Sequence, residues 1–439
     1  MPLKILLISP IGLKKILGAD FFFKLPFLGL PTIAAHTPPD CEVKMVDERI
    51  SPVDFTTDAD LIGISVMTPL ATRAYEIADE FRLRGKTVVM GGMHVSALPE
   101  EALEHCDAVA IGEGEKVWPH MVEDFKRGEL KEIYQADELL DLGESLPPRW
   151  DIIDKSLYSP VDFIETTRGC PINCNFCAVT HYYGAKYRTK PVHLVEEMVA
   201  RVRPVDKVFA LKNLVFFVDD NIIANRKHCI ELLNMLKSYN IQWVGQASVG
   251  VAKDDELMQL MSETRCLGLF IGMESLSEDA LAECGKRINK PAEYLSAVAK
   301  LHSYGIGVQA AFIIGFDNDD ISIFPKMEKF IRKSNFDSLF LSILTPYPGT
   351  RFYKKIEKEG RLLHKDWQRY DSSHVVFRPQ KMTPKQLEEG YILLYKKALS
   401  MKCIVMRLAR ARTNPQFFGP SNMAFRSCLF KMLRGNKKI

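Results

Sequence analysis

Short apolar runs alternate with helical patterns along most of this chain, and the alternation falls into two blocks. A buried strand followed by a crossover helix and a second buried strand gives a parallel sheet. In the first block the strand-like runs lie at 3–9, 43–46, 60–65, 87–90 and 108–111, with helical patterns at 71–84 and 99–105. We therefore predict an α/β protein whose N-terminal domain is a doubly wound, Rossmann-like sheet.

The second block contains six further strand-like runs, separated in most cases by helical patterns. These runs lie at 162–166, 214–218, 243–247, 267–273, 308–314 and 338–344. Six strand–helix units are too few for a closed eight-stranded barrel, so we predict a partial (β/α)6 barrel. The expected domain limits are 1–127 for the first sheet, 128–158 for a linker, 159–350 for the barrel and 351–439 for a small, helical, basic C-terminal cap.

The ten cysteines are distributed unevenly: seven are scattered singly and three lie within eight residues of one another. That pattern favours a reducing cytoplasm and one metal site over a disulfide scaffold. The hydrophobic fraction of 47% and the charged fraction of 26% are those of an ordinary globular protein. No uncharged apolar stretch reaches about 18 residues, so a membrane-spanning helix is not expected.

The three clustered cysteines are Cys170, Cys174 and Cys177, in the spacing C-x3-C-x2-C, directly after the first strand of the second block. Barrel enzymes place their chemistry in such loops, and cysteine thiolates are the usual ligands of iron–sulfur clusters. Three ligands for a four-iron cluster leave one iron open. A structural zinc ion would need His181 as a fourth ligand, and the resulting spacing fits no common zinc module.

With Phe176 before its last cysteine, the motif resembles the hallmark of the radical S-adenosylmethionine superfamily. Further segments at the ends of successive barrel strands resemble that family in order. The resemblance implies that the open iron chelates S-adenosylmethionine, and that the ligand is contacted by Phe176, Asp219, Asp220, Gln246, Ser248, Glu274, Ile313 and Gly315. Cleavage of the ligand would then release a 5′-deoxyadenosyl radical.

Small and glycine-rich segments follow three strand-like runs of the first block: Ser65-Val-Met67-Thr68, Gly91-Gly-Met-His94 and Gly112-Glu-Gly-Glu115. With these segments the first domain resembles the cobalamin-binding domain that precedes the barrel in one branch of this superfamily, near the anaerobic magnesium-protoporphyrin ester cyclase and hopanoid methylase group. The resemblance implies cobalamin contacts from Ser65, Met67, Thr68, Gly91, Gly92, His94, Gly112, Glu113 and Gly114. The D-x-H-x-x-G loop that supplies histidine to cobalt is absent, because no Asp stands two residues before His94. We therefore expect cobalamin without a protein nitrogen on cobalt; the alternative is a degenerate domain that has lost the cofactor.

The resemblance implies C-methylation of an unactivated carbon on a bulky, lipid-like or tetrapyrrole-like substrate, supported by an electron donor such as flavodoxin or ferredoxin. No catalytic residue is assigned beyond the cofactors. The alternatives are oxidative cyclisation without methyl transfer and a non-catalytic cobalamin or redox sensor. A methylthiotransferase would need a second cluster on three cysteines, whereas residues 1–169 contain only Cys41 and Cys106.

Residues 401–439 contain nine Lys or Arg and no Asp or Glu, interleaved with Phe417, Phe418, Phe425, Leu429 and Phe430. Such a tail suits peripheral contact with an anionic inner-membrane surface; a solvated terminal helix is the alternative. The expected location is otherwise the cytoplasm. Nucleic acid is not an expected partner, since no recognition module accompanies the charge.

Overall fold

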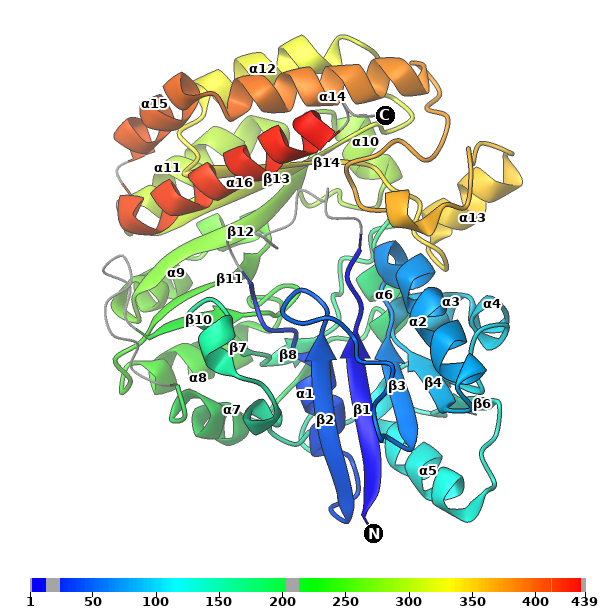
Figure 1. The fold of residues 1–439 in the computed structure, drawn as a ribbon. Coiled ribbons are helices and arrows are strands. Elements are labelled where there is room, and N and C mark those ends of the chain that lie inside the picture. Colours follow the sequence, from blue (N-terminus) through cyan, green and yellow to red (C-terminus); the bar gives the residue numbers. More distant parts are fainter. Residues whose placement is uncertain (1, 13–23, 203–212, 412, 436–439) are drawn as a thin grey trace.

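A computed structural model describes residues 2–12, 24–202, 213–411 and 413–435 of the chain. It has two six-stranded parallel sheets, one in each half of the chain, and a group of C-terminal helices above the second sheet (Figure 1). All pairings within both large sheets are parallel, as the alternation of strands and helices predicts.

The first sheet has the strand order β2-β1-β3-β4-β5-β6. Its strands are β1 (Leu3–Ser9), β2 (Cys41–Asp47), β3 (Leu61–Ser65), β4 (Thr87–Gly91), β5 (Ala108–Ile111) and β6 (Ile133–Gln135). The order reverses between β1 and β3, and in doubly wound sheets ligands bind beyond the strand ends at such a reversal. The predicted N-terminal fold is confirmed.

Helices cover both faces of this sheet. On one face lie α1 (Gly29–Ala35) and α5 (Gly114–Arg127), and on the other α2 (Ala71–Leu83), α3 (Met93–Ala97) and α4 (Pro99–Leu103). Because side chains alternate along a strand, Ile5 and Leu7 of β1 pack into the core on the α1 and α5 face. Leu6 and Ile8 pack into the core on the opposite face. A strand buried on both sides therefore reads as a continuous apolar run.

Strand β6 lies inside the range expected as a linker. Its residues pair in parallel with β5, Val109 opposite Ile133, so the first domain continues beyond residue 127. Three residues are too short a run to show a hydrophobic period. The Pro147-Pro148 pair further along the same range favoured a linker.

The second sheet has its strands in sequence order and forms the partial (β/α)6 barrel. Its strands are β7 (Val161–Ile164), β10 (Leu214–Phe217), β11 (Gln242–Ala247), β12 (Cys266–Glu274), β13 (Gly307–Ile314) and β14 (Ser338–Ile343). The helices of this half are α6 (Ala178–Tyr183), α7 (Val192–Val199), α8 (Arg226–Leu236), α9 (Asp255–Glu263), α10 (Glu278–Glu283), α11 (Tyr294–Ser303) and α12 (Ile323–Lys333). A short antiparallel pair, β8 (Thr167–Arg168) and β9 (Arg188–Thr189), flanks the cysteine loop.

The C-terminal cap comprises α13 (Arg351–Lys358), α14 (Pro384–Ala398), α15 (Met401–Ala411) and α16 (Pro415–Gly435). Helices α14 to α16, orange to red in Figure 1, lie together over the barrel. Phe418 of α16 packs onto the backbone of Gly268 and Gly307, where a Cβ on Gly307 would stand 2.2 Å from its ring. Between α13 and α14, Trp367 and Tyr370 join a core of the first domain, so the cap contacts both domains.

Among the described residues, no helix combines the length and the apolar character that crossing a membrane would require.

Candidate cofactor site between the two domains

Hydrogen bonds from neighbouring elements hold both ends of the cysteine loop in place. The Asp219 carboxylate accepts hydrogen bonds from the backbone N–H groups of Thr166 and Thr167, both at 2.7 Å, and from the Thr166 hydroxyl at 2.6 Å. On the far side of the loop, the Asn175 N–H donates to the Cys284 carbonyl at 3.0 Å, and the Phe352 N–H donates to the Asn175 carbonyl at 2.9 Å. The loop is therefore anchored to the segments that directly follow β10 and α10, and to α13.

The three thiols are half-buried. Burial raises the pKa of all three, that of Cys174 to about 12, so loading a metal must displace their protons. Within the described part of the chain, no three His, Cys, Asp or Glu side chains are arranged to share a single ion, His181 included. In a four-iron cluster each cysteine binds a different iron, so its thiols need not converge on one point.

Two aspartates follow β10 and have different surroundings. Asp219 is fully buried and occupied by the three hydrogen bonds above, and burial raises its pKa to about 7. Asp220 accepts one hydrogen bond, from the Gly169 N–H at 3.2 Å, and faces a cavity. Burial raises the pKa of Asp220 to about 6. Of the two, Asp220 is the carboxylate available to a ligand beside the cysteine loop.

A buried ion pair at the end of β12 was missed by the sequence analysis. Lys286 Nζ lies 2.6 Å from Glu274 Oε1, and both residues are buried. Burial opposes the charge on Lys286, but Glu274 and the nearby Cys174 raise its pKa. Gly272 makes room for this pair, since a Cβ there would lie 2.3 Å from the Glu274 carboxylate. The only signal in the sequence was a lysine in the turn after α10.

The remaining residues expected at the S-adenosylmethionine site lie around the same barrel end. Ser248 is held through its N–H by the Asn221 side chain at 3.1 Å, and the Gln246 carbonyl accepts from the Ile222 N–H at 2.9 Å. Gly315 has a φ of 107° and donates to Asp319 at 2.9 Å. An apolar wall beside them is formed by Phe176, Ile313 and Phe316.

A cavity of about 340 Å³ lies between the two domains. From the first domain it is lined by six of the nine residues expected to contact cobalamin: Ser65, Gly91, Gly92, Gly112, Glu113 and Gly114. From the barrel it is lined by Thr167, Arg168, Tyr182, Val218 and Asp220, among others. The backbone at Gly92 has a φ of 108°, and a Cβ there would stand 2.7 Å from the Val66 carbonyl, so a close approach requires glycine.

The other three residues expected at cobalamin do not line this cavity. Met67 is half exposed, and Thr68 is buried with its hydroxyl 3.4 Å from His94 Nδ1. The His94 ring is fully buried, with its Nε2 3.1 Å from the Tyr75 hydroxyl and 3.3 Å from Glu101. Both nitrogens of His94 therefore face protein groups within the first domain.

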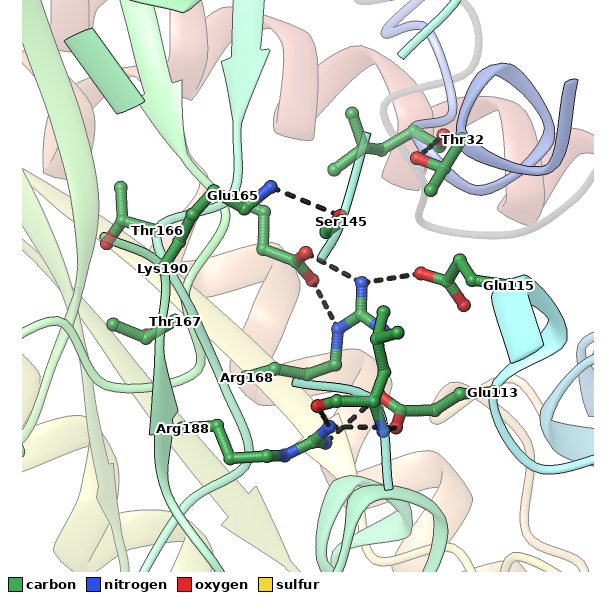
Figure 2. A network of polar contacts seen from close by, with 12 residues as sticks. Thr32, Glu113, Glu115, Ser145, Glu165, Thr166, Thr167, Arg168, Arg188 and Lys190 are labelled. Carbon is green, nitrogen blue, oxygen red and sulfur yellow. Dashed lines mark hydrogen bonds and ion pairs between the residues drawn. The ribbon is translucent and has the colours of Figure 1, made fainter. Parts of the chain in front are cut away.

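A charged network crosses the domain boundary beside the cavity (Figure 2). Arg168, which precedes the cysteine loop, donates to Glu113 at 2.7 Å and to Glu115 at 2.8 Å in the first domain, and to Glu165 at 2.7 Å in its own. Arg188 donates to the other Glu113 oxygen at 2.8 Å. Burial opposes ionisation of Glu113, but the two arginines lower its pKa below the ordinary value.

The network occupies the Glu113 carboxylate with partners from the protein. Although Glu113 stands at a strand end facing the cavity, its carboxylate accepts hydrogen bonds from Arg168, Arg188 and the Leu140 N–H. In addition, the Tyr182 hydroxyl of α6, the helix that follows Cys177, donates to the Gly112 carbonyl. Arg168 before the cysteine loop and Tyr182 after it are thus both tied to strand ends of the first domain.

The donor sets fit the expected cofactors: three thiols on one anchored loop, charged and polar groups around them, and a glycine-rich cavity opposite. Residues 164–360 match the radical SAM superfamily, and residues 14–122 match the B12 binding domain.

The relatives agree. Bacteriochlorophyllide d C-12(1)-methyltransferase of Chlorobaculum tepidum is 33% identical over 84% of this chain and 81% of its own. Hopanoid C-2 methylase of Rhodopseudomonas palustris is 28% identical, over 78% and 66%. The solved structure of the radical S-adenosylmethionine methyltransferase TsrM from Kitasatospora setae, with cobalamin and [4Fe-4S] cluster bound, has a TM-score of 0.66 at 16% identity, covering 89% of this chain and 85% of its own. The chain belongs to the cobalamin-binding radical S-adenosylmethionine enzymes and works with a [4Fe–4S] cluster, S-adenosylmethionine and cobalamin.

Proposed function

We propose that this enzyme methylates an unactivated carbon of a bulky, apolar substrate of the tetrapyrrole or lipid type. The observation that carries the proposal is the single cavity that reaches both the glycine-rich strand ends and Asp220 beside the cysteine loop. Two of the similar enzymes named above are methyltransferases of a bacteriochlorophyllide and a hopanoid, two large apolar ring systems. When bound, the cluster and S-adenosylmethionine supply a carbon-centred radical, and cobalamin carries the methyl group.

Each group of residues has one task in this proposal. Cys170, Cys174 and Cys177 hold the cluster. Asp220 and the Glu274–Lys286 pair offer charged groups to the amino, carboxylate and ribose groups of S-adenosylmethionine. Asp219 positions the loop instead of binding the ligand, because its oxygens already accept three hydrogen bonds.

The apolar wall of Phe176, Ile313 and Phe316 suits the adenine ring. Across the domain boundary, Gly91, Gly92, Gly112 and Gly114 let the backbone approach cobalamin closely. The interdomain charges then hold the two cofactor sites together and exclude water between them.

The test uses S-adenosylmethionine labelled in its methyl group, with anaerobic turnover on a cell-free lipid and pigment extract and mass spectrometry of the products. Methyl transfer predicts label in the product, with 5′-deoxyadenosine and S-adenosylhomocysteine formed in about equal amounts. A product lighter by two hydrogens, formed with deoxyadenosine but without S-adenosylhomocysteine, would reject methylation in favour of oxidative cyclisation. Absence of S-adenosylmethionine cleavage in reduced, fully loaded protein would favour a sensor.

The cluster assignment has its own test. Anaerobically reconstituted protein should bind about four irons, and a variant with Cys170, Cys174 and Cys177 all changed to Ala should bind none. Cys284 also lies beside the loop, so Cys284→Ala is the matched control and should keep its iron. Full iron content in the triple variant would overturn the assignment.

We also propose peripheral contact with an anionic membrane through α15, in a protein that otherwise works in the cytoplasm. The structure narrows the surface expected from the sequence, because Phe418 and Leu429 are buried in the barrel and the buried Arg407 donates to the Ala398 carbonyl. The exposed residues of α15 include an apolar and basic set, Met401, Lys402, Val405, Met406 and Arg410. Arg412, Lys437 and Lys438 lie outside the described residues.

Vesicles of anionic lipid test this contact. Val405→Glu with Lys402→Glu should abolish co-sedimentation, and added salt should weaken binding of the parent protein. Binding that is unchanged by either treatment would contradict the contact.

A further inference from the structure

The cavity between the domains is lined by residues before and after the cysteine loop, among them Arg168 and Tyr182, but by none of the three cysteines. A separate groove of about 380 Å³ is formed by the loop, α6 and the start of α13. Among its lining residues are Cys174, Cys177, His181, Arg351 and Lys354. The groove is therefore the place where two of the three thiols approach the outer surface.

This outer side carries unpaired positive charge. Arg351, Lys354 and Lys358 recur at i, i+3 and i+7 along α13, so they share one helix face, and all three are exposed. Arg351 donates to the Asn173 side chain in the cysteine loop at 2.9 Å. Within the described residues, no carboxylate forms an ion pair with any of the three.

The acidic residues of this region are already neutralised. Lys355 pairs with Glu283 at 2.8 Å, Arg361 with Glu359 at 2.7 Å, and Lys365 with Glu357 at 3.2 Å. The sequence around the groove is itself basic, since residues 351–365 contain six Lys or Arg and two Glu. The field outside the groove is therefore positive. Helix α13 stands at the rim of the molecule, beside the helices of the first domain, where a partner can reach it (Figure 1).

We infer that the face of Arg351, Lys354 and Lys358 is the docking surface for an acidic, low-potential one-electron carrier protein. The inference rests on the cluster assignment within the proposed function. Each S-adenosylmethionine cleavage consumes one electron, which leaves the reduced carrier and enters the cluster; no bond between the two proteins is made or broken. Cys174 and Cys177 line this outer groove and do not line the cavity between the domains, so a carrier docked at the groove stands next to two of the cluster ligands.

Charge complementarity identifies the partner as acidic. A small, transient interface gains mostly encounter rate from opposite charges, so docking should be fast and sensitive to salt. A flavodoxin, with acidic side chains around its flavin, is the probe with this chemistry.

The test compares two reductants on the loaded enzyme. The variant Lys354→Glu with Lys358→Glu leaves Arg351, the cysteines and the cavity untouched. With reduced flavodoxin at low salt, its rate of cluster reduction should fall about tenfold or more, whereas with dithionite the rate should equal that of the parent. Lys227→Glu with Lys237→Glu, at α8, imposes the same change in net charge and should leave both rates unchanged.

The outcomes separate the docking surface from the chemistry. A parent-like flavodoxin rate in the Lys354/Lys358 variant would overturn the inference, as would an equal loss in the α8 control. A loss with dithionite as well would also count against docking, because the lysines would then be needed by the cluster itself. The neutral variant Lys354→Gln with Lys358→Gln should give an intermediate rate with a weaker salt dependence. Failure of S-adenosylmethionine cleavage in the parent enzyme reduced by dithionite would refute the proposed function independently.

Discussion

Arg168 and Glu113 form a buried ion pair across the domain boundary, with the guanidinium nitrogen 2.7 Å from the carboxylate oxygen and both side chains almost without exposure. Arg168 stands two residues before Cys170, and Glu113 stands two residues after β5, at the start of α5. The pair therefore joins the cluster loop directly to the cobalamin domain. A buried pair of this kind fixes geometry more than it adds stability, because desolvation offsets much of its attraction.

The first prediction concerns this coupling. Arg168→Met should lower the free energy of unfolding by about 3–5 kcal/mol, since three carboxylates lose a buried partner. The methylated product formed per 5′-deoxyadenosine should fall about tenfold or more, because methyl transfer depends on the distance between the two sites. Arg168→Lys keeps the positive charge, so its free energy of unfolding and its product ratio should lie between those of the parent and those of Arg168→Met. An unchanged ratio would show that the domains keep their spacing without the pair.

The second prediction concerns Glu274 and Lys286. Lys286→Met should destabilise the fold by about 3–5 kcal/mol by leaving a buried carboxylate without its partner. Adding Glu274→Gln should recover much of that loss, because the charge that needed Lys286 is gone. Urea unfolding of the two single variants and the double variant measures the coupling. Purely additive losses would show that the two side chains do not stabilise each other.

The third prediction concerns the contact of Phe418 with the barrel. Gly307→Ala should cost about 1–3 kcal/mol by overpacking, and Phe418→Ala about 3–5 kcal/mol by leaving a cavity. In α16, Gly419→Ala is the matched control. The nearest atom to its added Cβ is 4.0 Å away, so it should be neutral or stabilising by up to about 1 kcal/mol. Thermal unfolding distinguishes the three, and equal effects at positions 307 and 419 would contradict the packing argument.

The fourth prediction concerns cobalt. Because His94 is enclosed by Thr68, Tyr75 and Glu101, the Co(II) form should show no nitrogen splitting from the protein in electron paramagnetic resonance. His94→Gln should leave that spectrum unchanged and lower the free energy of unfolding by about 1–3 kcal/mol through lost buried hydrogen bonds. A histidine signal that disappears in the variant would contradict this picture.

Much of the fold could be predicted because its elements are long and strongly patterned. The strand expected at 108–111 is β5 without change, and the run at 3–9 is β1. β6 was hidden because a three-residue edge strand has no period to detect, and it depends on its partner β5 for its conformation. Trp367 and Tyr370 gave no sign that they would cover the first domain, because that contact spans more than 260 residues of sequence.

The candidate site divides in the same way. The cysteine spacing and the glycines at strand ends are local, so the sequence by itself determined the cluster loop and the cofactor classes. The sequence could not show which of the adjacent Asp219 and Asp220 carboxylates is available to a ligand. Asp219 accepts hydrogen bonds from backbone groups that lie 52 and 53 residues away in the sequence.

Only the tertiary structure decided that Glu113 pairs with Arg168 and that Lys286 meets Glu274. It also decided that, in the part of the chain that the structure describes, no carboxylate pairs with Arg351, Lys354 or Lys358. Spacing along a chain specifies which atoms a short loop can present. Which charges are neutralised depends on what lies opposite them in space, because a buried charge is tolerated only where folding brings it a partner.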